Sequence, residues 1–192
     1  MNLEKAEEYI LGELWLRLPE TLFYHGLHHV KDVMNAALYL AGQEGITDEE
    51  SIQLLRTAAL YHDSGFMNTY QNHEEEGCRI VRRMLPDFGY TEVQIELICG
   101  MIMATKIPQQ PQNLLEKIIC DADLDYLGRD DFESIAATLF EELKFRNLIS
   151  DQKSWNRIQI KFLTAHHYWT GSAIKLRAST KAKHLDQLVK SS

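Results

Sequence analysis

Residues 47–65, with the sequence TDEESIQLLRTAALYHDSG, decide the expected fold. Thr47 and Glu50 have the spacing of a capping box, which predicts that a helix begins here. The apolar side chains that follow recur with a helical period and would share one face: Ile52, Leu55, Ala58 and Ala59. The helix is expected to end near His62, because a serine and a glycine follow shortly after it. This stretch therefore predicts a helix that buries one side.

The rest of the chain shows the same helical period and no long alternation of β-branched residues. A second capping box, at Thr91 and Gln94, begins another helix. Its buried side is expected to hold Val93, Leu97, Ile98, Met101 and Ile102. Further helices are expected at 3–18, 28–42, 73–85, 113–127, 130–147, 152–168 and 172–189. The sequence thus predicts an all-α bundle of about nine helices.

Composition indicates one globular domain over residues 1–192. The chain is 45% hydrophobic and 25% charged, and no linker rich in Gly, Ser and Pro divides it. Its formal net charge of −8 argues against nonspecific binding of nucleic acid. No run of 18 apolar residues occurs, and the N-terminus lacks the basic start of a signal peptide. We therefore expect a cytoplasmic protein with no membrane or nucleic-acid partner.

Histidines, rather than cysteines, mark the expected functional site. Five of the eight histidines fall within 49 consecutive positions: His25, His28, His29, His62 and His73. The three cysteines lie in apolar helical segments without Cys-x-x-Cys spacing and are expected to be reduced core thiols: Cys78, Cys99 and Cys120. Imidazole and carboxylate together suit zinc and divalent metals of the first transition row. A His/Asp metal site is therefore expected.

Three segments could supply this site. The first, YHGLHH, places His25 and His29 four residues apart, although histidines at a helix start can also be plain surface residues. The second is the adjacent pair His62 and Asp63, which by itself more often indicates a surface turn. The third, CDADLDYLG, holds three acids that cannot share one solvated face: Asp121, Asp123 and Asp125. At least one of these should point inward and need a cation or hydrogen-bond donors.

In this order, a His, a His-Asp pair and an Asp about 60 residues later, the segments resemble the HD superfamily of metal-dependent phosphohydrolases. The first segment also resembles the phosphodiesterase signature Tyr-His-Asn-x-x-His-x-x-Asp-Val, matched by Tyr24, His25, His29, Asp32 and Val33. Gly26 replaces the Asn of that signature, which leaves a cyclic nucleotide substrate open. The segments NHEEEG, ATKIP and DADLDYLG resemble those of bacterial HD-domain proteins. The resemblance implies an HD core at about 20–130, with the C-terminal helices packed on it.

The resemblance also implies roles for individual residues. The metal ligands would be His29, His62, Asp63 and Asp123, with Asp121 as the alternative to Asp123. His25 would protonate the leaving alkoxide, and His73 would contact a second metal or a phosphate. Lys106, where a helix gives way to a loop, is open to two interpretations, a phosphate ligand or a solvated cation at a helix end. The ligand set is compatible with one or two ions of Mn, Fe, Co, Ni, Zn or Mg.

The expected function is metal-dependent hydrolysis of a phosphate ester or anhydride in a small molecule, with a nucleotide as the leading candidate. The alternative is a ligand-binding or regulatory module that retains a structural metal and turns nothing over. A third possibility is a hydrolase of stress nucleotides that carry a 3′-pyrophosphate. The C-terminal aromatic residues are expected to pack in the fold: Trp155, Tyr168 and Trp169. His166 and His167 are expected either to pack there or to place a charge at a helix end.

Overall fold

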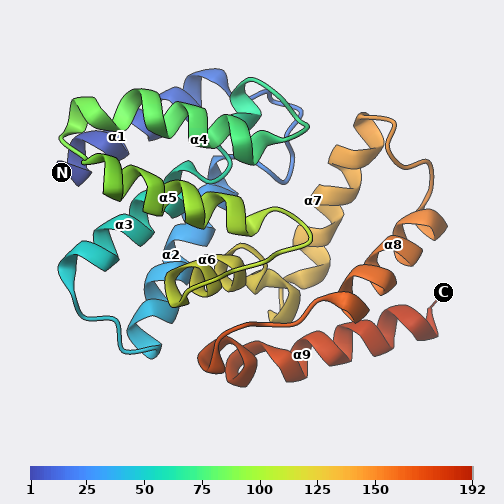
Figure 1. Ribbon diagram of the computed structural model, residues 1–192. Coiled ribbons are helices and arrows are strands. Elements are labelled where there is room, and N and C mark those ends of the chain that lie inside the picture. The colour runs from blue at the N-terminus through green and yellow to red at the C-terminus, as the bar shows by residue number, and fades with distance from the viewer. Residues whose placement is uncertain (192) are drawn as a thin grey trace.

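The computed structural model describes residues 1–191, which form nine α-helices and three short 3-10 helices with no strand (Figure 1). The all-α prediction is confirmed. In chain order the elements are α1 (Leu3–Arg17), α2 (Leu27–Gln43), α3 (Glu49–Tyr61), η1 (Ser64–Met67), α4 (His73–Met84), η2 (Leu85–Phe88), α5 (Glu92–Thr105), α6 (Leu114–Asp123), η3 (Asp125–Gly128), α7 (Phe132–Phe145), α8 (Gln152–Ala165) and α9 (Gly171–Lys190).

The first six α-helices surround one hydrophobic cluster. Helix α2 packs against α3 and α6, and α5 packs against α3, α4 and α6. The buried face of α2 includes Val30, Val33 and Ala37, at the three- and four-residue spacing of a helical stripe. Small residues on α3, Ala58 and Ala59, are completely buried in the same cluster. Burial of each large apolar side chain in such a core stabilises the fold by about 1.5–3 kcal/mol.

A second hydrophobic cluster lies between η3, α7 and α8. Its buried members are Tyr24, Leu124, Tyr126, Leu127, Phe132, Ala136, Ile149, Trp155 and Leu163. Helix α9 packs on α8 and η3 (Figure 1), and Arg177 on α9 donates two hydrogen bonds to Asp125, at 2.7 and 2.9 Å. A Cβ on Gly128 would come within 2.5 Å of the Arg177 backbone, so only glycine permits this contact. The three C-terminal helices, α7, α8 and α9, therefore pack around the second cluster.

The predicted face of α5 was partly wrong. Val93 and Leu97 are 71% and 46% exposed, whereas Ile95 and Cys99 are buried in their place. The capping box at Thr91 is present, so the helix begins where predicted. The error arises because apolar residues lie on nearly every side of this helix, and its pattern cannot select the inner face.

The capping box predicted at Thr47 was also wrong. Asp48 caps α3 instead, and its carboxylate accepts a hydrogen bond from the Ser51 N–H at 2.8 Å. Helix α3 therefore begins at Glu49, one residue later than a Thr47 cap requires. Both residue types are good caps, so the sequence offered two registers one residue apart.

Two helices end earlier than expected. The predicted helix over 113–127 ends at Asp123 and is followed by η3. The predicted helix over 152–168 ends at Ala165, so that His166 lies just beyond it, edge-on to the buried ring of Tyr168. The three cysteines are buried and unpaired, as predicted. Within residues 1–191, no helix has the length and apolar character needed to cross a membrane.

Candidate metal centre

Four side chains from three separate segments meet between the two hydrophobic clusters. His29 lies on the first turn of α2, His62 and Asp63 follow the end of α3, and Asp123 ends α6. Oδ1 of Asp123 lies 3.1 Å from Nε2 of His29 and 3.6 Å from Nε2 of His62. Oδ2 of Asp63 lies 3.5 and 3.3 Å from the same two nitrogens. Imidazole nitrogens and carboxylate oxygens thus alternate around one small space.

The donor atoms fit a divalent cation. The ligand atoms of His29, His62 and Asp123 all lie within 4.8 Å of one another. Nδ1 of His62 donates to the Ala59 carbonyl oxygen at 2.8 Å, which turns Nε2 towards the carboxylates. Nε2 of His62 and Oδ2 of Asp63 are buried and have no hydrogen-bond partner. A cation between them would satisfy both atoms, which is the arrangement that nitrogen and oxygen ligands provide for first-row metals and zinc.

The electrostatics of these residues also indicate a cation. Burial alone would raise the pKa of Asp63 and of Asp123, but the neighbouring histidines outweigh it and hold both pKa values below the ordinary range. Burial would lower the pKa of His62, but the charges of the nearby Asp63 and Asp123 carboxylates raise it well above its ordinary value. One buried and one half-buried carboxylate therefore require positive charge here, which a divalent ion can supply in place of protons.

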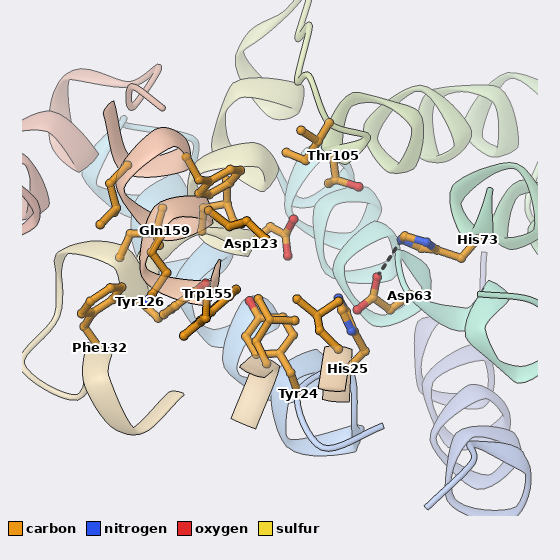
Figure 2. Close-up of a pocket in the computed structure, with 18 of the residues that line it drawn as sticks. Tyr24, His25, Asp63, His73, Thr105, Asp123, Tyr126, Phe132, Trp155 and Gln159 are labelled. Carbon is orange, nitrogen blue, oxygen red and sulfur yellow. Dashed lines mark ion pairs between the residues drawn. The ribbon is translucent and has the colours of Figure 1, made fainter. Parts of the chain in front are cut away.

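His73 lies next to this cluster and completes its outer edge (Figure 2). Its Nε2 is 3.5 Å from Oδ1 of Asp63, the oxygen that faces away from the other two histidines, and its ring stacks on Phe66 at 3.9 Å. Phe66 also contacts the ring of His25, with centroids 4.4 Å apart. Gly65 allows the backbone of His73 to come close to η1, because a Cβ at this glycine would lie 1.9 Å from the His73 carbonyl oxygen.

His25 is held by a buried acid that the sequence analysis missed. Glu142 on α7 is 0% exposed, and its Oε1 lies 2.6 Å from Nδ1 of His25. Its other oxygen accepts from the backbone N–H groups of Tyr24 and His25, and the Tyr70 hydroxyl donates to Oε1 at 3.1 Å. The available signal was a carboxylate on the apolar face of its helix, three residues after Leu139.

The three acids of CDADLDYLG have separate partners. Asp123 faces the histidines, and Asp125 pairs with Arg177. Asp121 is 0% exposed and accepts from the Trp169 N–H, the Thr170 N–H and the Thr170 hydroxyl, at 2.7–2.8 Å. Burial raises the pKa of Asp121 to about 6, while these hydrogen bonds lower it. Asp121 thus fastens the start of α9 to α6, and its carboxylate is turned away from the histidines.

This arrangement predicts that Asp121 stabilises the fold without holding a metal. Asp121→Ala should leave two buried N–H donors and a hydroxyl without an acceptor and destabilise the fold by about 2–4 kcal/mol. For a chain of this size the melting temperature should fall by roughly 5–10 °C. Metal content, measured by elemental analysis, should stay at the wild-type level. Loss of metal from this variant would identify Asp121 as a ligand.

Lys106 lies away from the cluster. It ends α5, and its amine binds the Glu75 carboxylate and Oδ1 of Asn72. A cavity adjoins the cluster, and Lys106 does not line it, although its neighbours Thr105 and Ile107 do. A phosphate contact by Lys106 stays a prediction, and the ion pair with Glu75 is the role that the geometry favours.

A cavity of about 290 Å³ opens from the candidate metal centre into the second hydrophobic cluster (Figure 2). At one end it is lined by polar residues, namely His25, Asp63, His73, Glu74 and Asp123. At the other end the walls come from η3, α7 and α8 and include the rings of Tyr126, Phe132, Trp155 and Phe162. Gln159 is the polar residue on that apolar wall. The cavity thus suits a molecule with a charged end and a bulky, flat, weakly polar end.

An all-α bundle with a candidate His/Asp metal centre beside a cavity defines a class of helical metal-dependent hydrolases. The HD domain model matches residues 26–125, so this chain belongs to the HD domain family. No curated protein sequence matches it. A predicted HD superfamily hydrolase from an uncultured Thermotogales bacterium is 22% identical, with a TM-score of 0.61 over 96% of this chain and 91% of that one. YpgQ of Bacillus subtilis, solved in complex with ADP, is 20% identical, with a TM-score of 0.67 over 100% and 97%.

These two structures share the fold over almost their whole length. The C-terminal helices, which lie outside the matched residues 26–125, are therefore covered by the structural similarity as well. Family and fold together support a metal-dependent hydrolase.

Proposed function

We propose that this protein hydrolyses a phosphate ester or anhydride of a small molecule, with a nucleotide as the leading substrate class. The observation that carries the proposal is the alternating set of imidazole nitrogens and carboxylate oxygens, which opens into a cavity shared with His25. We assign His29, His62, Asp63 and Asp123 as the metal ligands. A divalent ion bound there would activate water and offset the charge of a phosphoryl group.

His25 is the proposed general acid. Its Nδ1 is bound to Glu142, so the opposite nitrogen, Nε2, is available to a substrate in the cavity. A protonated imidazole can give a proton to the leaving oxygen. Glu142 positions the ring and stabilises the protonated form, as a buried carboxylate does for a catalytic histidine. A purely structural metal site would not need this pair.

The apolar end of the cavity is the proposed site for the organic part of the substrate. Trp155 and Phe162 offer flat surfaces on which a base can stack. Gln159 is only 8% exposed, and its side-chain amide makes no hydrogen bond to another residue in 1–191, so it is available to the polar edge of a base. The ADP complex of YpgQ, a protein of similar fold, makes adenine nucleotides the first compounds to test.

The test is elemental analysis of the purified protein, combined with phosphate release from cyclic, mono- and polyphosphorylated nucleotides under added Mn, Mg, Co and Ni. Nucleotides with a 3′-pyrophosphate belong in the panel. One or two metal equivalents with turnover would support the proposal. Metal without turnover on any compound would favour the non-catalytic module. No metal after reconstitution would contradict the assigned site.

Glu142→Gln should lower kcat by about 10- to 100-fold with little change in metal content, because the amide cannot stabilise a protonated His25 as a carboxylate does. Burial raises the pKa of Glu142, but the hydrogen bond and charge of His25 outweigh it and lower the pKa below the ordinary 4.5. The ionised carboxylate therefore stabilises the wild type above pH 4.5, and this contribution is lost as pH falls through the lowered pKa.

The pH dependence supplies a second measurement on this variant. In thermal unfolding scans, wild type should exceed Glu142→Gln in stability at pH 6–7, and the gap should narrow below pH 4.5. Glu141→Gln, an exposed neighbour, is the matched control. A kcat for Glu142→Gln equal to wild type would show that the acid does not act through His25.

A further inference from the structure

Arg146 carries an uncompensated charge against Tyr70, a residue that lines the cavity. It follows α7, and its guanidinium carbon lies 3.8 Å from the ring centroid of Tyr70. Its Nε is buried without a hydrogen-bond partner. Among residues 1–191, no carboxylate lies within ion-pair distance of it, and the acid one turn earlier, Glu142, is already bound by four other donors. A partly buried guanidinium in this state is available to an oxyanion.

Three other cations, which adjoin cavity-lining segments without lining the cavity, are already paired with acids. Lys106 binds Glu75. Arg129 binds Asp32 and Asp131, and Arg177 binds Asp125. The residues that line the cavity include no Lys or Arg, although several of them are acids. Phosphate groups beyond the first would therefore lack a protein cation inside the cavity itself.

Tyr70 places Arg146 within reach of this site. Tyr70 lines the cavity, and its ring centroid is 6.2 Å from that of His25. One face of the Tyr70 ring carries the Arg146 guanidinium, and the Tyr70 hydroxyl donates to the acid that holds His25. Tyr70 lies in the loop between η1 and α4, so this contact brings the end of α7 against that loop. The guanidinium thus stands one aromatic ring away from the proposed general acid.

We propose that Arg146 forms an anion subsite at the edge of the cavity, which binds a second phosphate of the substrate while the first lies at the metal centre. The planar guanidinium suits phosphate oxygens, to which it can give two parallel hydrogen bonds. The substrate class is then a di- or triphosphate rather than a monophosphate ester. This inference rests on the function proposed for the same site and narrows its substrate.

The test is isothermal titration of the metal-loaded protein with inorganic pyrophosphate and with orthophosphate. Wild type should bind pyrophosphate more tightly, and Arg146→Gln should weaken pyrophosphate binding by about 10-fold or more while changing orthophosphate binding by less than about 2-fold. Arg146→Lys, which keeps the charge, should restore most of the difference. Arg157→Gln, an exposed arginine of α8 that does not line the cavity, is the matched control and should leave both affinities unchanged.

Three results would overturn this inference. They are equal affinities of wild type for the two anions, a preference for pyrophosphate that survives in Arg146→Gln, and equal losses for both anions in Arg146→Gln and Arg146→Lys. The last would mean that Arg146 only supports the Tyr70 ring. The metal content and phosphate release of wild type are measured separately, so failure of the anion subsite and failure of the proposed hydrolase can be told apart.

Discussion

Asp63→Ala should remove the bound metal and at least about 10³-fold of the turnover. Asp63 supplies the carboxylate oxygen between His29 and His62, and its other oxygen faces His73. Without it, the two imidazole nitrogens lose one of the two negative groups that draw a cation between them. A bound divalent ion stabilises transition-state charge by several kcal/mol, and about 1.4 kcal/mol corresponds to each tenfold in rate.

The measurement for Asp63→Ala is metal content and phosphate release beside wild type, with circular dichroism to establish that the helices persist. Asp130→Ala, which removes an exposed acid just after η3, is the control and should keep both metal and turnover. Retention of a full metal equivalent by Asp63→Ala would contradict the ligand assignment. Retained turnover without metal would contradict the mechanism as a whole.

His25→Ala should lower turnover by about 10²-fold or more while the metal stays bound. His25 makes no contact with a carboxylate of the metal cluster, and its removal leaves three other donors on Glu142. The expected change in stability is therefore small. The decisive readout is the leaving group: an alkyl ester needs a proton on its leaving oxygen, whereas a nitrophenyl ester does not.

The loss in His25→Ala should thus be large for a nucleotide or alkyl ester and much smaller for p-nitrophenyl phosphate. His28→Ala is the matched control, because this exposed histidine lies in the same segment. Equal losses for both kinds of ester would exclude His25 as the general acid. Loss of metal together with activity would instead make His25 part of the metal centre.

Much of the fold followed from local sequence. The helical period, the caps and the absence of alternating strands predicted nine helices, and most of their bounds lie within two or three residues of the structure. Where several sides of a helix are apolar, as around Val93 and Leu97, local sequence could not choose the inner face. That choice depends on which neighbouring helix covers which side, and this is a tertiary property.

The candidate site, like the fold, was predictable from the sequence only in part. The order of His29, His62, Asp63 and an acid near 123 is a pattern in the sequence, and it was enough to predict a His/Asp metal centre. Spacing alone could not decide whether Asp121 or Asp123 is the ligand, because the sequence does not show which residues each carboxylate meets. The structure separates them because Asp121 meets the backbone that begins α9, 48 residues away in sequence.

By itself, then, the sequence determined the helical class and the family and predicted the residue types of the candidate metal centre, because these depend on local period and on a spaced motif. Only the tertiary structure decided that Glu142 holds His25 and that Arg146 stands unpaired against Tyr70. Those contacts join residues 117 positions apart in one case and about 76 in the other. A buried charge depends on the partners that folding brings to it, and those partners cannot be read from its immediate neighbours in the chain.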